Sequence, residues 1–345
     1  MSSEADFSGR VDEAWLAQYR EEIIEPELPI VDPHHHLWSR PGSVYLFPEL
    51  LADLSSGHNI RATIFEECGS MYRADGPEEL RSLGETEFVT GVAAMSASGG
   101  FGPARACAAI VGNVNLTLGS RVAPILEAHL AASGRRLSAI RFSTAWDADE
   151  RVHKTVPRPG ILAEKQFREG FQYLARFGLA FDAWVYHPQL NEVAALAADF
   201  PQTPIVLNHF GSPILGGPNA GRGAEVFAEW RKGMMTLASH DNVHVKLGAL
   251  PIRRSERSRG TSAPPLSSEE IAAAWRPFFD VCVEQFGARR CMFESNFPVQ
   301  KRWCSYAVLW NACKRLATGA SADEKSALFS GAAARTYRLR LPTQA

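Results

Sequence analysis

The chain has 345 residues, of which 46% are hydrophobic and 21% are charged, and its formal net charge is −2. This is the composition of a globular protein that is long enough to bury a large core. Because the chain has no basic excess and no apolar run longer than a strand, we expect neither nucleic acid nor a membrane as a partner.

Residues 1–27 are polar and acidic and show no apolar core of a signal peptide. We therefore expect an N-terminal extension ahead of a single domain at 28–340, in a cytoplasmic protein that is either a monomer or a homo-oligomer. The six cysteines form no CxxC pair, and in a chain of this length without a secretion signal we expect free thiols.

Short apolar runs alternate with longer helical stretches along the rest of the chain. The expected strands lie at 28–38, 60–69, 107–116, 137–146, 179–187, 204–211, 243–250 and 289–299. Helical patterns lie at 121–134, 162–178, 188–201, 267–287 and 321–339. Eight alternations predict an α/β fold, a (β/α)8 TIM barrel with a small insertion, 84–106, between strands two and three. A doubly wound open sheet is the alternative, but no GxGxxG or P-loop motif follows the first strand.

The first predicted strand, LPIVDPHHHLW, ends in three consecutive histidines. Neighbouring residues of a strand point to opposite faces, so His34 and His36 share one face and His35 faces the other. Such a pair is typical of a metal-binding or catalytic site that needs partners from elsewhere in the chain.

Polar or ionisable residues follow or end almost every other predicted strand. They are Glu66, Glu67, Tyr72 and Arg73 after strand two, Arg141 in strand four, His187 after strand five, Asn208 and His209 after strand six, Lys246 in strand seven, and Glu294 and Asn296 in strand eight. In a (β/α)8 barrel the carboxyl ends of the strands meet at one face, where the active site lies. We therefore expect these side chains to gather there.

A His-x-His pair and a later histidine can hold a divalent metal, with a carboxylate completing the set of ligands. We expect His34, His36 and His187 to bind one such ion, with zinc as the first choice. The metal would lower the pKa of its bound water to about 7 and polarise a carbonyl group, which suits the hydrolysis of an ester, lactone or amide.

Six segments in this order resemble the amidohydrolase superfamily: VDPHHHLW, AIRF, WVYHPQL, VLNHFGSP, VKLGAL and MFESNFPV. The resemblance covers about residues 28–340 and is greatest to the subgroup of lactonase-like barrels, which includes 2-pyrone-4,6-dicarboxylate lactonase and sulfomuconolactonase. It implies a hydrolytic site at the barrel mouth that contains His34, His36, His187 and His209. It also implies that Arg141 holds a substrate carboxylate.

One segment departs from the family pattern. The family usually ends strand eight with an aspartate, in a sequence like Gly-Ser-Asp-Trp-Pro, and here the residues are Glu294-Ser295-Asn296-Phe297-Pro298. An amide cannot act as a base at neutral pH. Glu294, which would start deeper in the barrel, and Glu67 are the candidate replacements.

Two mechanisms remain open from the sequence. In the first, His34, His36, His187 and a glutamate hold a metal whose hydroxide attacks the carbonyl. In the second, which the metal-independent members of the subgroup suggest, histidines and Arg141 polarise the carbonyl while Glu67, Glu294 or His187 activates water.

The expected substrate is a small anionic molecule, a carboxylated cyclic ester or a related compound with a C–O or C–N bond. Arginine forks match carboxylates, and aromatic rings can stack on a planar ring. The residues expected to contact it are Arg141, Tyr72, Arg73, Trp146 and Lys246, with Trp38 and Trp184 near the mouth and an arginine-bearing loop at Arg253, Arg254, Arg257 and Arg259. The alternatives are a non-oxidative decarboxylase and an inactive barrel with a binding role.

Overall fold

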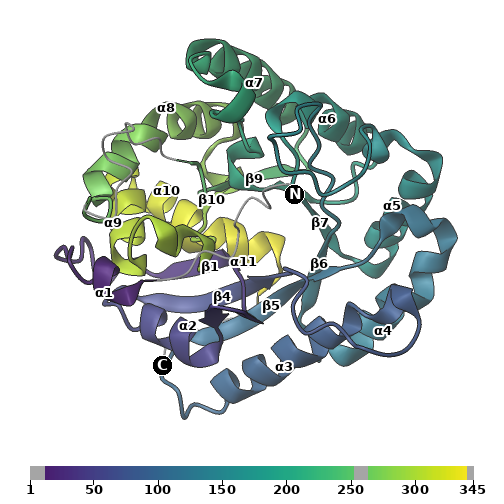
Figure 1. Cartoon of the computed structure of the whole chain (residues 1–345), viewed down its shortest axis with the longest axis horizontal. Coiled ribbons are helices and arrows are strands. Elements are labelled where there is room, and N and C mark those ends of the chain that lie inside the picture. Colours follow the sequence, from purple (N-terminus) through teal and green to yellow (C-terminus); the bar gives the residue numbers. More distant parts are fainter. Residues whose placement is uncertain (1–11, 252–262, 340–345) are drawn as a thin grey trace.

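The computed structural model describes residues 12–251 and 263–339, and within them eight parallel strands form a ring that helices surround (Figure 1). The strands follow one another around the ring in chain order: β1 (Ile30–His35), β4 (Ile60–Glu66), β5 (Arg105–Asn113), β6 (Leu137–Arg141), β7 (Ala180–Ala183), β8 (Ile205–Leu207), β9 (Val243–Leu247) and β10 (Cys291–Phe293). Seven strands fall inside their predicted runs and β5 begins two residues before its run, so the predicted barrel is confirmed.

The ring is nearly closed by the residues that follow β10. Phe297 forms an isolated parallel bridge with His35, and its carbonyl oxygen accepts a hydrogen bond from the backbone N–H of His36 at 2.7 Å. The N–H of Asn296 in turn donates to the carbonyl oxygen of His34 at 2.8 Å. The closure therefore holds the histidines of the first strand beside Asn296.

One short helix precedes the first strand, and the others lie between successive strands or after the last strand. They are α1 (Glu13–Leu16), α2 (Phe47–Leu54), α3 (Leu83–Ala97), α4 (Val122–Ala132), α5 (Lys165–Phe177), α6 (Leu190–Asp199), α7 (Gly223–Ala238), α8 (Ser268–Phe286), α9 (Tyr306–Leu316), α10 (Ala322–Ser326) and α11 (Ala332–Thr336). Every predicted helical stretch contains one, although 321–339 is interrupted by a π-helical turn at Ala327–Gly331. None of the helices among the described residues is long and apolar enough to cross a membrane.

The additional element of the barrel is not where the sequence placed it. Most of the segment 84–106, predicted as an insertion, belongs to α3, the ordinary connecting helix between β4 and β5. Its weak amphipathic pattern, which includes buried Glu85 and Thr86, concealed the helix. The extra element is an antiparallel hairpin after β1, formed by β2 (Trp38–Arg40) and β3 (Ser43–Tyr45).

Two apolar cores hold the barrel together. The larger lies between the strands and the outer helices, and His35 packs there, with its ring 6.0 Å from that of Phe65. The smaller fills the inside of the barrel with mostly small side chains and is closed at the bottom by Tyr337 and neighbouring alanines of α11. Small side chains inside the barrel leave room for the charged groups that lie above them.

Candidate active site

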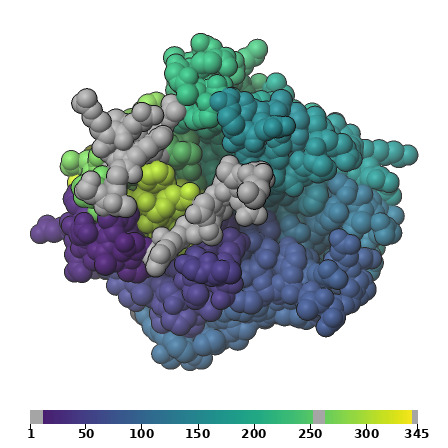
Figure 2. Space-filling model, viewed as in Figure 1, coloured from purple at the N-terminus to yellow at the C-terminus, as the bar shows by residue number. Residues whose placement is uncertain are grey.

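A cavity of about 640 Å³ opens at the carboxyl ends of the strands. Its walls are largely aromatic, with Trp38, Trp184, Tyr186 and Trp303, and the polar side chains at its inner end are His36, Arg141, His209 and Asn296. The molecule is hollowed toward its centre on the face drawn in Figure 2. An apolar cavity with a few converging polar groups is the usual form of a small-molecule site.

Glu294 lies between two histidines beneath this cavity. Its Oε1 is 2.7 Å from Nδ1 of His209 and also accepts the His209 backbone N–H at 3.1 Å. Its Oε2 is 2.8 Å from Nδ1 of His34, although the angles there do not make a hydrogen bond. Both His34 and Glu294 are fully buried. The carboxylate is therefore held in place by the ring and backbone of His209, with His34 on its other side.

The carboxylate determines which nitrogen of His209 carries the proton. A carboxylate only accepts, so Nδ1 of His209 is the donor and the lone pair lies on Nε2. His209 is one of the residues that line the cavity. The arrangement thus gives a cavity-lining histidine with a buried carboxylate behind it, which is the relation between base and orienting acid in hydrolytic triads.

His36 has a hydrogen-bond partner at each of its ring nitrogens, the backbone of Glu66 and the side chain of Asn296. Nδ1 lies 2.9 Å from the carbonyl oxygen of Glu66, which only accepts, so this nitrogen carries a proton. Burial, followed by the charge of Arg141, holds the pKa of His36 well below its usual value, so Nε2 is unprotonated. Nε2 lies 3.1 Å from Oδ1 of Asn296. Because two acceptors cannot bond to each other, we infer that the Asn296 amide is turned so that its NH₂ group donates to Nε2.

A layer of buried charge supports the two histidines from inside the barrel. Nζ of Lys246 donates to Glu66 at 2.7 Å and to Asp182 at 2.6 Å, and lies 3.2 Å from Nδ1 of His34. Burial would lower the pKa of Lys246, but Asp182 and Glu66 raise it above the usual value. Burial, followed by the charge of Lys246, keeps the pKa of His34 well below its usual range, so His34 is neutral.

Arg141 is tied to the carboxylates at the end of β4. Its Nε lies 2.6 Å from Glu67 and 3.2 Å from Glu66, and its terminal nitrogen also donates to the Glu67 backbone oxygen. Its guanidinium carbon is 5.7 Å from the centre of the Trp184 ring. Arg141 is therefore a fixed cation in the cavity wall, and much of its hydrogen-bonding capacity is used by the protein itself.

The backbone is strained where three neighbouring strands leave the ring. Positive φ angles, which non-glycine residues seldom adopt, occur at His209 (56°), Phe210 (53°) and Ser212 (45°) after β8. They recur at Ala249 (58°) after β9 and at Asn296 (52°) after β10. Such conformations gather at functional sites, where the surrounding structure holds them.

The structure regroups the metal ligands that the sequence suggested. His34, His209 and Glu294 lie together, whereas His187 does not belong to this group and does not line the cavity. Strand β7 ends at Ala183, so His187 falls beyond it in a 3₁₀ turn, where its Nδ1 accepts the N–H of Ile214 at 3.3 Å. A group of possible ligand atoms among the described residues is therefore His34, His209 and Glu294, and the set of His34, His36 and His187 stays a prediction.

Several predicted substrate contacts lie elsewhere. Arg73 is exposed and paired with Glu87, and neither it nor Tyr72 lines the cavity. Trp146 lies outside the lining residues as well, beneath the ammonium group of Lys154. Lys246 is fully buried in the charged layer rather than at the mouth, because two carboxylates hold it there. The arginines of 253–259 lie outside the described residues, whereas Trp38 and Trp184 do line the cavity.

Other site residues were missed in the sequence. Asp182 accepts from Lys246, from the hydroxyl group of Tyr337 at 2.8 Å and from the amide of Asn208 at 3.1 Å. A charged residue in the middle of the apolar run LAFDAWV was the available signal. Tyr337 offered none, since only the folding of α11 across the barrel bottom brings its hydroxyl group to Asp182.

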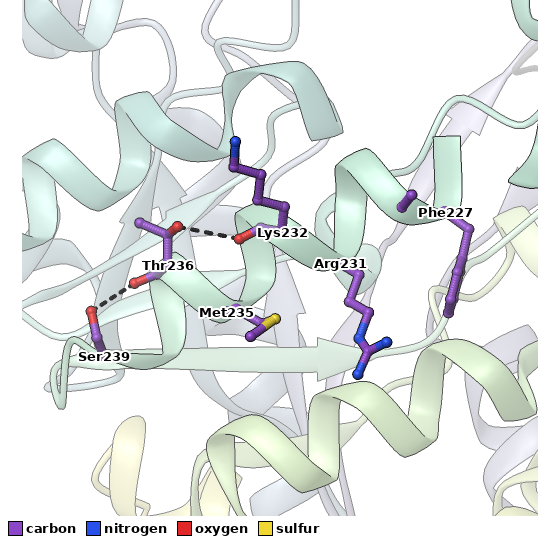
Figure 3. A pocket seen from close by; sticks show the side chains of 7 residues that line it. Phe227, Arg231, Lys232, Met235, Thr236 and Ser239 are labelled. Carbon is purple, nitrogen blue, oxygen red and sulfur yellow. Dashed lines mark hydrogen bonds between the residues drawn. The ribbon is translucent and has the colours of Figure 1, made fainter. Parts of the chain in front are cut away.

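A second hollow, on the outer face of α7, has a volume of about 810 Å³, and its described lining residues belong to that helix and to its C-cap, Ser239 (Figure 3). Figure 3 shows its labelled side chains along the helix, with the hydroxyl groups of Thr236 and Ser239 bonded to backbone oxygens of the same helix. It contains no convergent titratable groups and lies away from the strand ends. The cavity at the barrel mouth is therefore the candidate active site.

The residues beneath the cavity fit a divalent metal. His34, His209 and Glu294 each offer one ligand atom within 4.8 Å of the others, and two imidazoles with a carboxylate are a donor set of catalytic zinc sites. Nε2 of His34 and Oε2 of Glu294 are buried without a hydrogen-bond partner. The buried carboxylates here are Glu66, Glu67, Asp182 and Glu294, and among the described residues the cations paired with them are Lys246 and Arg141. A divalent cation would offset this excess of negative charge.

Comparison with known proteins gave a match to the amidohydrolase family model over residues 31–339. The chain is 32% identical to protein y4mH of Sinorhizobium fredii (strain NBRC 101917 / NGR234), over 91% of this chain and 99% of that one. It is 30% identical to an L-fucono-1,5-lactonase of Burkholderia multivorans (strain ATCC 17616 / 249), over 61% and 66%. A crystal structure of an amidohydrolase from Burkholderia multivorans with bound Zn superposes with a TM-score of 0.66, at 26% identity over 90% and 99% of the two chains.

Proposed function

Since the chain belongs to the amidohydrolase family, we propose that it hydrolyses the ring ester bond of a small lactone that carries a carboxylate. The observation that carries this proposal is the pairing of His209 with the buried carboxylate of Glu294 at the inner end of the cavity. The similarity to an L-fucono-1,5-lactonase supports a lactone as the substrate class.

His209 is the proposed base. Its Nε2 takes a proton from water as the water oxygen bonds to the lactone carbonyl carbon, and Glu294 stabilises the imidazolium ion that forms. When the ring C–O bond breaks, the same nitrogen returns the proton to the departing ring oxygen. The opened chain carries one new hydroxyl group and one new carboxylic acid, which releases its proton to solvent to become a carboxylate, and the base is regenerated.

Two other residues that line the cavity can stabilise the negative charge on the carbonyl oxygen. The Arg141 guanidinium group is fixed by Glu67, so it needs no rearrangement when the charge develops. Asn296 lies beside it with an uncharged amide, which can donate or accept without repelling an anionic substrate. A carboxylate at position 296 would add repulsion there.

A divalent metal is compatible with the same residues. His34, His209 and Glu294 would hold it, and it would supply Lewis-acid polarisation of the carbonyl group. With the metal bound, His209 would be a ligand, so the role of its Nε2 as the base belongs to the enzyme without metal. The work of the chain's other groups is the same with or without it: Lys246 keeps His34 neutral and in place, and Asn296 holds His36.

The cavity walls support a cyclic, anionic substrate. Trp38 and Trp184 offer flat apolar faces, and the guanidinium group of Arg40 lies 4.4 Å from the centre of the Trp38 ring. Arg40 also donates to the Cys68 backbone oxygen at 2.8 Å, which orients it. A positioned arginine beside an aromatic face suits a carboxylate on a ring.

The test is a panel of sugar 1,5-lactones and carboxylated lactones, followed by proton release at constant pH and by product analysis. We expect ring opening, faster for lactones that carry a carboxylate. Elemental analysis of the purified protein and activity after chelation then report whether a metal contributes. Release of CO₂ from a carboxylated substrate without ring opening would contradict the proposal and favour the decarboxylase alternative.

A further inference from the structure

The side chain of Glu294 reaches His34 and His209 through a narrow space beside Gly248. It follows β10 directly, and its backbone N–H lies 3.4 Å from the carbonyl oxygen of Leu247, the last residue of β9. Because Phe293 pairs with Leu247, the next residue of each strand, Glu294 and Gly248, lie side by side.

Gly248 leaves the space through which the Glu294 side chain passes. A Cβ atom at position 248 would lie 2.4 Å from Cγ of Glu294 and 2.6 Å from its carbonyl oxygen. Separations below 3.0 Å are essentially never seen for real Cβ atoms. Gly248 is not among the glycines with positive φ, so the requirement for glycine here is one of space and not of backbone conformation.

We propose that Gly248 is a positioning residue for the reaction, because its missing side chain is what lets Glu294 lie against His209. The expected effect on catalysis rests on the function proposed above. The steric requirement for glycine at position 248 does not depend on that function. A side chain at 248 would push the carboxylate away, and His209 would lose the partner that holds its proton on Nδ1. Ala249, the next residue, has a positive φ and lines the cavity, so this exit from β9 has little freedom to shift.

The steric part is tested by a cycle of four proteins: wild type, Gly248→Ala, Glu294→Gly and the double variant. We expect Gly248→Ala to lower the thermal midpoint by several degrees more in the wild-type background than in the Glu294→Gly background, where the Cγ contact is gone and only the contact with the backbone oxygen of residue 294 remains. If Gly248→Ala alone does not fold and the double variant does, the proposal is supported. Equal losses in both backgrounds, or failure of both to fold, would overturn it.

The catalytic part is tested by kinetics and by NMR of the histidine rings. We expect Gly248→Ala to lower kcat about 100-fold with little change in KM, because the cavity walls are untouched and only the base is misplaced. The Nδ1–H signal of His209 should also shift or disappear. An unchanged kcat together with an unchanged His209 signal would overturn the positioning role.

Gly233→Ala is the matched control. A Cβ there would lie 2.7 Å from the Leu190 side chain, on α7 and away from the cavity, so it creates a similar clash without reaching the histidines. It should lose stability and keep kcat. If the wild type hydrolyses no lactone, the proposed function fails while the stability cycle and the His209 signal still report on Gly248.

Discussion

At the scale of single residues, the histidines that follow the strands look alike in the sequence and differ in the structure. His209 has a buried carboxylate 2.7 Å from one ring nitrogen, and this leaves the other nitrogen to act as a base. In His187, one ring nitrogen accepts a hydrogen bond from the backbone N–H of Ile214, and the other lies 3.8 Å from a carboxylate oxygen of Glu229. The bond to Ile214 holds the loop after β8. Their surroundings thus support His209 rather than His187 as the proposed base.

The first prediction follows from this difference. His209→Asn should lower kcat/KM for the lactone by about 10²–10⁴-fold, the usual contribution of a general base. His187→Asn, the control, should change it by less than about tenfold, since this ring touches no reacting atom. Steady-state kinetics on both variants, with circular dichroism to check folding, provide the measurement. A larger loss for His187→Asn than for His209→Asn would reverse the assignment.

At the scale of elements, the short parallel strands decide which charges meet inside the barrel. Strands β4, β7 and β9 bring Glu66, Asp182 and Lys246 to one level, above the small apolar core. Burial, followed by the charge of Asp182, raises the pKa of Glu66 well above its usual value. Burying these three charged groups costs free energy. Because Nζ of Lys246 lies 3.2 Å from Nδ1 of His34, the layer is in a position to hold the His34 ring.

The second prediction concerns this layer. Lys246→Met should lower the free energy of unfolding by about 3–5 kcal/mol, because it leaves Asp182 buried without its paired cation and Glu66 with Arg141 alone. Adding Asp182→Asn to this variant should recover part of the loss. Urea unfolding of the two proteins measures both values. If Lys246→Met were as stable as the wild type, the carboxylates of the layer would not depend on the charge of Lys246.

The third prediction concerns the packing of α3 against α4 and its dependence on pH. His129 of α4 lies 2.8 Å from the Thr86 hydroxyl and 3.2 Å from that of Ser82, and burial lowers its pKa to about 4. The unfolded value is about 6.5, so the stability that the neutral ring contributes is present above pH 6.5 and is lost as the pH falls toward 4.

The stability difference between wild type and His129→Gln should therefore shrink on acidification. The expected change is about 3 kcal/mol between pH 7 and pH 4, since the pKa shift spans about two and a half units. Denaturant unfolding of both proteins at intervals of pH gives this difference directly. A difference that stays constant over that range would show that His129 titrates alike in the folded and unfolded states.

At the scale of the whole molecule, the described part of the N-terminal extension is attached to the outside of the barrel. Asn311 of α9 donates to Glu21 and to the Glu22 backbone oxygen, and its Oδ1 accepts from Ile24. The buried ammonium group of Lys314 donates to the backbone oxygens of Ile24 and Glu25 at 2.7 and 2.8 Å. The segment therefore covers α9 as part of the domain's surface.

The fourth prediction tests this attachment. Lys314→Met should increase amide hydrogen exchange in residues 21–27 by at least about tenfold, because the backbone oxygens lose a buried partner, and kcat should be unchanged. Lys325→Met is the control, since its ion pair with Glu25 lies nearer to solvent and contributes little. Hydrogen-exchange mass spectrometry measures both. Equal protection of the segment in wild type and Lys314→Met would show that Lys314 does not hold it.

The sequence by itself determined the barrel, because eight apolar runs separated by helical stretches can bury their surfaces in few other ways. It also placed His34 and His36 on one face of a strand and His35 on the other, since that follows from local geometry alone. Local geometry also named Glu294 and Glu67 as the two candidate replacements for the missing aspartate, but it could not choose between them.

Only the tertiary structure decided which of these groups meet. The four-residue length of β7 left His187 outside the cluster, the return of the chain after β10 brought Asn296 to His36, and α11 carried Tyr337 under Asp182. Distances between strands depend on where each strand ends and on what fills the barrel. Those quantities arise from packing across the whole ring, so no single segment of sequence contains them.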